Sequence, residues 1–169
     1  MTDALPQQYR EYEIIMSDKP APVTVGIVPS TTMGHVLFIE RADGGLALPG
    51  GYLEKLEDTS TALTRESFEE MDLELEPHKW RLFHSVVTPC NKLILFSHYV
   101  EPVDLPRNFE SNDEVLRVLA APWNTPLVFA SHEEALKLWA SSSGLAPLQL
   151  RPRRVLNALQ PIFAQRSLG

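Results

Sequence analysis

Two adjacent glycines, Gly50 and Gly51, stand ahead of a segment that is both strongly acidic and helical in its spacing. Glu66, Glu69 and Glu70 are three and four residues apart, and an α-helix presents such positions on one face. Like charges placed this way cost roughly 0.2–0.5 kcal/mol per exposed pair, whereas a hard cation such as Mg²⁺ would bind between the carboxylates. The segment therefore predicts a metal-binding helix, unless it is only a solvated acidic surface.

The spacing of the flanking residues favours the metal-binding alternative. Gly51 is followed after five residues by Glu57, and after seven more by Arg65-Glu66-x-x-Glu69-Glu70-x-x-Leu73. This pattern resembles the Nudix box, G-x5-E-x7-R-E-U-x-E-E-x-G-U, in which U is a bulky apolar residue. The resemblance implies a Nudix hydrolase with an α/β fold, the family's α/β/α sandwich with a mixed β-sheet.

The same resemblance assigns chemistry to the acidic residues, which become the candidate catalytic groups. It implies that Glu69 and Glu70 bind Mg²⁺ directly, with Mn²⁺ as a substitute, and that Glu66 binds a second ion or positions water. The carbonyl group of Gly50 would be a backbone ligand of the metal. Bound Mg²⁺ neutralises phosphate oxygens and lowers the pKa of attacking water, as hydrolysis of a negatively charged phosphoanhydride requires.

Three further residues of the box are expected to support the site structurally. Gly51 allows the backbone to approach a ligand closely. Arg65 should form a bidentate ion pair with Glu57, which would tie the loop to the helix. Leu56 stands at a loop position that is often glycine in relatives, so this loop should be stiffer or differently bent.

The acidic helix is predicted to begin after Asp58, whose carboxylate can accept the free N–H groups of the first turn. Its apolar contacts are expected from Ala62, Leu63, Phe68 and Met71. Ser67 stands where the family has an apolar residue, which should slightly weaken packing. Asp72 stands where glycine ends the helix, and aspartate enters the left-handed region more readily than most residues.

A general base is expected outside the box, in a loop before a late strand, because many relatives place it there. The candidates lie in one acidic loop and are Glu110, Asp113 and Glu114. Glu114 is favoured because it directly precedes a predicted strand. For each of them the alternative is an ordinary surface carboxylate.

The box predicts a reaction type and leaves the substrate to other residues. Pro89 follows Leu73 by sixteen positions, which resembles the ADP-ribose pyrophosphatase subgroup, although a turn between strands explains it equally well. Aromatic side chains that could stack on a base are Tyr52, Phe83, Phe96, Tyr99 and Trp123. Most aromatic residues on strands are core residues, so Tyr52, Phe83 and Pro89 are the substrate-binding candidates.

The sequence leaves three functions open. The first is a Mg²⁺-dependent hydrolase of a nucleoside diphosphate linked to another group, with an ADP-ribose-like substrate as the leading guess. The second is a pool-cleaning pyrophosphohydrolase of (d)NTPs or oxidised nucleotides. The third, a Nudix-fold sensor without catalysis, is disfavoured because such modules typically lose box carboxylates and this chain keeps them.

The rest of the chain predicts alternating strands and helices. Strands are predicted at Val23–Pro29, His35–Glu40, Leu46–Leu48, Trp80–Thr88, Lys92–Val100 and Glu114–Ala121. The first two should form a hairpin. A helix is predicted over Glu133–Ser141 with Ser131 as its cap.

Length and composition set broader limits. The 169 residues predict a single domain over 1–169, with an N-terminal arm or first strand in 1–20 and a C-terminal helix in 150–169. A net charge of −7 disfavours general nucleic-acid binding, and the sequence lacks an apolar run long enough for a membrane. The single cysteine, Cys90, suits a cytoplasmic protein. The expected partner is a small nucleoside diphosphate derivative, and a homodimer is expected only by analogy.

Overall fold

The structure is a computed structural model that describes residues 21–89 and 91–144. The expectations for 1–20, Cys90 and 150–169 lie outside the described residues. The elements are β1 (Val23–Ile27), β2 (His35–Arg41), β3 (Leu46–Ala47), β4 (Gly50–Tyr52), α2 (Thr59–Met71), the 3₁₀ turn η1 (Pro77–Lys79), β5 (Trp80–Val87), β6 (Leu93–Tyr99), β7 (Val115–Pro122) and α3 (Ala130–Ser142).

The strands of the described residues form two sheets. The first has the order β4-β1-β6-β5, and the second has the order β3-β2-β7. β1 runs antiparallel to β4 and parallel to β6, so the first sheet is mixed. Every residue of β1 is buried, which is expected for a strand that is covered on both faces.

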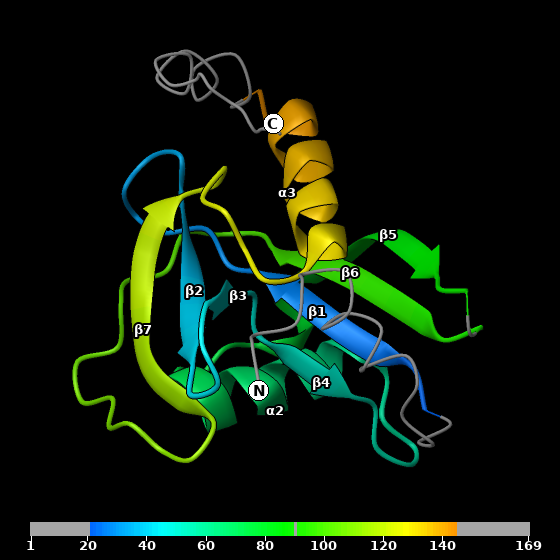
Figure 1. Ribbon diagram of the computed structural model, residues 1–169, viewed down its shortest axis with the longest axis horizontal. Coiled ribbons are helices and arrows are strands. Elements are labelled where there is room, and N and C mark those ends of the chain that lie inside the picture. The colour runs from blue at the N-terminus through cyan, green and yellow to red at the C-terminus, as the bar shows by residue number, and fades with distance from the viewer. Residues whose placement is uncertain (1–20, 90, 145–169) are drawn as a thin grey trace, which may run out of the picture.

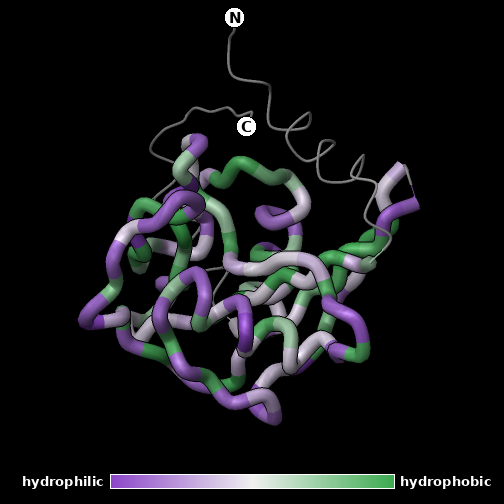
Figure 2. Tube along the Cα trace, turned by 90° about the horizontal axis from the view of Figure 1, so that it is seen from below, coloured by the Kyte–Doolittle hydropathy of each residue, from purple (hydrophilic) through white to green (hydrophobic). Residues whose placement is uncertain are grey.

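Helices α2 and α3 lie on opposite sides of the strands, which confirms the predicted α/β layering (Figure 1). Val23, Val25 and Ile27 of β1 pack in one core cluster with Leu136 and Trp139 of α3. A second cluster surrounds the buried face of α2 and contains Leu63, Met71, Trp80 and Tyr99. Hydrophilic residues concentrate in the peripheral loops (Figure 2). No helix in the described part of the chain is long and apolar enough to cross a bilayer.

The predicted hairpin between the first two strands is wrong. β1 and β2 belong to different sheets, and their antiparallel contact is reduced to an isolated bridge between Pro29 and Val36. The flanking residues make the hydrogen bonds of this bridge, from the Leu37 amide to the Val28 carbonyl and from the Ser30 amide to the His35 carbonyl, both at 2.9 Å. β1 pairs instead with β6, about seventy positions further along the chain, in a register that starts at Val23 and Ile94.

The ends of α2 agree with the sequence. Asp58 is the N-cap, and its carboxylate accepts a hydrogen bond from the Thr61 amide at 2.8 Å. Asp72 ends the helix in the left-handed conformation, with φ 57°. Phe68 differs from the expectation, because its side chain is 52% exposed and leaves the core contacts to neighbouring positions.

Two other boundaries differ from the prediction. The strand predicted at Leu46–Leu48 ends at Ala47, and a separate strand that was not predicted, β4 (Gly50–Tyr52), follows and pairs with β1. Helix α3 begins at Ala130, so Ser131 lies inside the helix and does not cap it. Phe129 is at the N-cap position without a side-chain hydrogen bond, and Glu133 in the first turn accepts the amide of Leu127, ahead of the helix, at 2.8 Å.

His132 connects α3 to the loop ahead of Gly50. Its ring is buried against Phe96 and Phe129, with centroid distances of 5.9 and 4.8 Å. Its Nδ1 accepts a hydrogen bond from the Leu48 amide at 3.4 Å. Burial lowers the pKa of His132 to about 3, and the charge of Arg41 acts in the same direction.

We predict that His132 makes the protein acid-sensitive. The unfolded state takes up a proton on this histidine below about pH 6.5, whereas the folded state stays neutral until about pH 3. The free energy of unfolding should therefore be unaffected by His132 above pH 6.5 and fall below it, by at most about 1.4 kcal/mol per pH unit. Urea titrations of wild type and His132→Gln between pH 7.5 and 4.5 measure this. Parallel pH profiles of the two proteins would contradict the prediction.

Candidate active site

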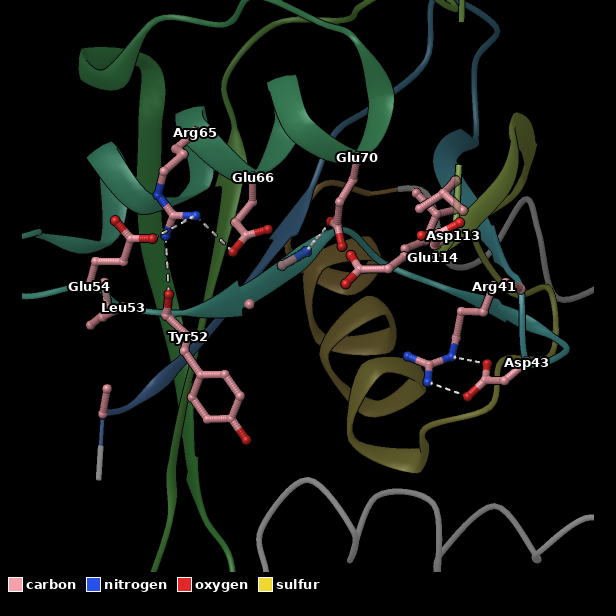
Figure 3. Close-up of a pocket in the computed structure, with 16 residues that line it drawn as sticks. Arg41, Asp43, Tyr52, Leu53, Glu54, Arg65, Glu66, Glu70, Asp113 and Glu114 are labelled. Carbon is pink, nitrogen blue, oxygen red and sulfur yellow. Dashed lines mark hydrogen bonds and ion pairs between the residues drawn. The ribbon is translucent and has the colours of Figure 1, made fainter. Parts of the chain in front are cut away.

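A pocket of about 760 Å³ opens where β2, β4, α2 and the start of β7 meet. Its charged lining residues, among those the structure describes, are Arg41, Asp43, Glu54, Arg65, Glu66, Glu70, Asp113 and Glu114. In Figure 3, Glu66, Glu70 and Glu114 lie between Tyr52 on one side and the Arg41–Asp43 pair on the other. Carboxyl groups from a helix and from a distant loop are thus brought to one cavity.

The three acidic residues of the box take different positions. Glu66 and Glu70 line the pocket and are half-buried. The Glu70 carboxylate accepts a hydrogen bond from the Gly50 amide at 2.9 Å. Glu69 is not among the pocket-lining residues; its side chain is 54% exposed and lies 3.2 Å from Nη1 of Arg65. The structure thus brings Glu66 and Glu70 together and leaves Glu69 at the rim.

Arg65 joins the loop, the strand and the helix that surround the pocket. Its Nε and Nη2 donate to the two carboxylate oxygens of Glu57 at 2.7 and 2.9 Å, which is the bidentate pair expected from the sequence. Nη2 also donates to the carbonyl oxygen of Tyr52 at 3.1 Å. The Arg65 hydrogen bond holds the pKa of Glu57 below its ordinary value, so the pair stays ionised.

The half-buried carboxyl groups carry unfavourable charge. Burial raises the pKa of Glu66 to about 7 and that of Glu70 to about 8, because desolvation penalises the ionised form. The negative charge of Glu114 raises both pKa values further. Arg65 opposes the shift at Glu66, and the Gly50 amide opposes it at Glu70. The cations of the protein therefore do not offset the cost of ionising Glu66 and Glu70, and both carboxyl groups hold a proton more readily than an ordinary glutamate.

Gly50 and Gly51 lie so close to neighbouring atoms that a side chain at either position would collide with them. A Cβ atom at Gly50 would overlap the backbone carbonyl of Thr24, since β4 packs directly on β1. A Cβ atom at Gly51 would overlap the carboxylate of Glu66. The first contact is with backbone that cannot move, whereas the second is with the end of a flexible side chain.

Glu114 is held at the pocket by its backbone. The side-chain oxygen of Asn112 accepts the amides of Glu114 and Val115 at 2.8 and 2.9 Å. The carbonyl oxygen of Glu114 accepts the Ala42 amide at 2.8 Å. Of the three candidate bases, Glu114 and Asp113 line the pocket and Glu110 does not.

The substrate-binding candidates separate in space. Tyr52 lines the pocket, with Nζ of Lys92 5.2 Å from its ring centroid. Phe83 lies on β5, and the centroid of its ring is 5.7 Å from that of the His98 ring. Pro89 is exposed in the turn after β5. Neither Phe83 nor Pro89 lines the pocket. The other aromatic candidates are buried core residues: Phe96, Tyr99 and Trp123.

Sequence reasoning missed Arg41 and Asp43. Arg41 lies at the end of β2, and Asp43 follows in the turn. The positive charge of Arg41 acts on Glu70, whose pKa it lowers in opposition to burial. The sequence offers one hint, a basic residue at the last position of a strand before Asp43-Gly44-Gly45. That pattern does not show that the end of this strand lines the same pocket as the box helix.

The residues at the pocket fit a divalent cation in their chemistry. Carboxylate oxygens are the ligands that Mg²⁺ prefers, and burial makes Glu66 and Glu70 costly to ionise unless a cation lies beside them. Within 21–89 and 91–144, no three His, Cys, Asp or Glu side chains form a ready-made metal cluster. The pocket therefore supplies two half-buried carboxyl groups and an exposed one nearby, and it does not supply a closed cage.

The comparisons with known proteins agree with this geometry. A model of the NUDIX domain matches residues 20–158. No curated protein matches the chain. Among solved structures, MutT in a study of Aliivibrio salmonicida and Vibrio cholerae has a TM-score of 0.58 at 16% identity, covering 73% of this chain and 99% of that chain.

Two further structures share the fold. MutT NUDIX hydrolase from Burkholderia pseudomallei has a TM-score of 0.55 at 22% identity, covering 71% of this chain and 98% of that chain. Ap4A hydrolase from C. elegans has a TM-score of 0.57 at 12% identity, covering 72% and 98%. These identities establish the fold alone. Because the family model spans most of the chain, including every residue that lines the pocket, the chain belongs to the NUDIX domain family and is a Nudix hydrolase.

Proposed function

We propose that this Nudix hydrolase depends on Mg²⁺ and cleaves a phosphoanhydride bond in a nucleoside diphosphate that is linked to another moiety. The observation that carries the proposal is the meeting of Glu66, Glu70 and Glu114 in one pocket. Burial and mutual repulsion disfavour the ionised forms of Glu66 and Glu70, and a bound cation would reverse that cost.

The ligands of the metal would be Glu70, Glu66 and the carbonyl group of Gly50, with Glu69 contributing from the rim. When bound, Mg²⁺ supplies charge neutralisation of phosphate oxygens and a lowered pKa of water. The Gly50 amide holds the carboxylate of Glu70 at 2.9 Å, which orients it before any ligand arrives. Arg65 holds Glu66 from the other side, at 3.2 Å.

We assign the general base to Glu114. Its carboxyl group enters the pocket from the loop that directly precedes β7, a different element from the helix that carries Glu66 and Glu70 (Figure 3). A base has to accept a proton from water while the metal ligands keep their own oxygens engaged, so a carboxylate from a separate element suits the role. The Asn112 side chain fixes the backbone of Glu114 and so limits where that carboxylate can reach.

An ADP-ribose-like molecule is the leading substrate. The pocket volume of about 760 Å³ lies within the range of small-molecule sites, and Tyr52 offers an aromatic ring at one end. Pro89, which suggested this subgroup, does not line the pocket, so the substrate assignment rests on pocket size and Tyr52. The alternative is a (d)NTP or an oxidised nucleotide, which the same carboxylates would serve.

The first prediction concerns activity itself. With Mg²⁺ or Mn²⁺, wild type should release phosphate-containing products from at least one of ADP-ribose, NADH, diadenosine polyphosphates, coenzyme A and dNTPs. Glu70→Gln replaces a charged pocket carboxylate by a neutral amide and should lower turnover by about 10²-fold or more. Glu134→Gln, an exposed helix position outside the pocket, is the control. Absence of turnover in wild type on every substrate would contradict the hydrolase proposal and favour a sensor.

The second prediction separates the two glycines. Gly51→Ala should fold normally and displace the Glu66 carboxylate, lowering turnover by about tenfold to a hundredfold. Gly50→Ala should instead lower the free energy of unfolding by about 1–3 kcal/mol, because its Cβ meets backbone. Urea denaturation and initial rates distinguish the two effects. An active Gly51→Ala enzyme would remove Glu66 from the catalytic group.

The third prediction tests the base. Glu114→Gln should lower kcat by about 10²–10⁴-fold while substrate binding is retained. Glu110→Gln, four positions earlier in the same loop but outside the pocket, should leave kcat unchanged. Stopped assays for kcat and calorimetry for binding measure both. If the rate of Glu114→Gln equals that of wild type, the role passes to Asp113 or Glu66.

A further inference from the structure

Arg41 is the last residue of β2, where the pairing of the second sheet becomes irregular. β2 and β7 pair in regular antiparallel register from His35 to Glu40, and the register shifts between Glu40 and Arg41. Successive side chains of a strand point to opposite faces of the sheet. Glu40 pairs with Arg117 outside the pocket lining, whereas Arg41 lines the pocket. The end of β2 therefore carries a cation at the wall opposite the box helix (Figure 3).

The Arg41 guanidinium is held in place from two sides. Its central carbon lies 5.1 Å from the centroid of the Phe129 ring, a cation–π contact from the segment that leads into α3. Its Nε and Nη2 donate to the two carboxylate oxygens of Asp43, both at 2.8 Å. Asp43 thus occupies the Nε–Nη2 edge, one of the two edges of the guanidinium that can hold a phosphate with two hydrogen bonds.

Among the residues described, Arg41 is one of two cationic side chains in a pocket whose other charged groups are carboxyl groups. The described lining residues include six carboxyl groups and two guanidinium groups, those of Arg41 and Arg65. Arg65 donates to Glu57, Glu66 and Glu69 and is committed to the box. Arg41, in contrast, is paired with an exposed carboxylate. The side chain of Asp43 is 63% exposed and that of Arg41 is 31% exposed.

We propose that Arg41 binds a phosphoryl group of the substrate and that Asp43 is an internal competitor, which the phosphate displaces from the guanidinium. This inference rests on the proposed function, since it places the phosphoryl group in the same pocket. Exposed ion pairs contribute at most about fivefold to an equilibrium, so Asp43 is readily displaced. Charge-assisted hydrogen bonds to an ionised group contribute about 10- to 150-fold, so a phosphate on the same edge binds more strongly.

The positions of the residues agree with one extended ligand. Tyr52 and Arg41 lie on opposite sides of the carboxyl groups of Glu66, Glu70 and Glu114 (Figure 3). A nucleotide whose base contacts Tyr52 would carry its phosphates past these carboxylates toward Arg41. The inferred ligand class is therefore a nucleoside diphosphate or longer, and a nucleoside monophosphate should gain less from Arg41.

The test is a double-mutant cycle on binding. Calorimetry would use α,β-methylene-ADP, which cannot be cleaved at its methylene bridge, with Mg²⁺ and the full chain. Arg41→Met keeps an apolar stem against Phe129 and should weaken binding by about 10-fold or more. Asp43→Asn should tighten binding by about two- to fivefold. In the Arg41→Met background, Asp43→Asn should leave the affinity unchanged, because the guanidinium for which Asp43 and the phosphate compete is then absent.

A matched control removes the contribution of net charge. Glu40→Gln changes the charge of the protein as Asp43→Asn does, and Glu40 also forms an ion pair at the end of β2, with Arg117. Glu40→Gln should leave the affinity unchanged. If Glu40→Gln tightens binding as much as Asp43→Asn, or if Asp43→Asn tightens it equally without Arg41, long-range charge explains the effect and the inference is overturned.

The outcomes also separate this inference from the proposed function. Unchanged affinity in Arg41→Met, or no binding to wild type, overturns the phosphate site even if the enzyme cleaves a substrate. Binding with the expected cycle, but no hydrolysis of any substrate in the panel, supports the phosphate site and contradicts the proposed hydrolase. In an active enzyme, Arg41→Met should raise KM more than it lowers kcat.

Discussion

The bidentate ion pair between Arg65 and Glu57 is the interaction on which the pocket depends. It closes the loop between β4 and α2 at 2.7 and 2.9 Å, and the same guanidinium donates to the Tyr52 carbonyl and to Glu66. Because a guanidinium has five donors in a rigid fork, one side chain can fix loop, strand and helix together. The acidic face of α2 is therefore held at a defined angle to β4, and the carboxyl groups point into a pocket rather than into solvent.

Close packing supplies the second constraint. α2 buries Leu63 and Met71 on one side, and on another side Glu66 approaches Gly51 so closely that a β-carbon would not fit. Ser67 is fully buried between these sides, where a larger apolar residue is usual for the family. The apolar face packs the helix into the core, and the opposite approach to β4 places the Glu66 and Glu70 carboxyl groups against Gly51 and Gly50.

The sequence was sufficient for features whose partners are close along the chain. Asp58, Asp72 and the Arg65–Glu57 pair each depend on contacts within about one helix length, and all three are as expected. Features that depend on distant strands were not predictable. The β1–β2 hairpin failed because β1 pairs with β6, and Arg41 was missed because it reaches the pocket from a strand in the other sheet. Periodicity alone also could not show which box carboxylates face the cavity, which contains Glu66 and Glu70 and excludes Glu69 from its lining.

The charge balance of the pocket links the metal to the substrate. With six carboxyl groups and two guanidinium groups among its described lining residues, the cavity repels a polyanion. A divalent cation held by Glu66 and Glu70 would turn that repulsion into attraction, and a bound phosphate would in turn favour the cation. Such coupling is reciprocal by thermodynamic necessity, so each ligand strengthens the binding of the other by the same factor. An acidic pocket is therefore compatible with an anionic substrate, provided that the substrate and the cation bind together.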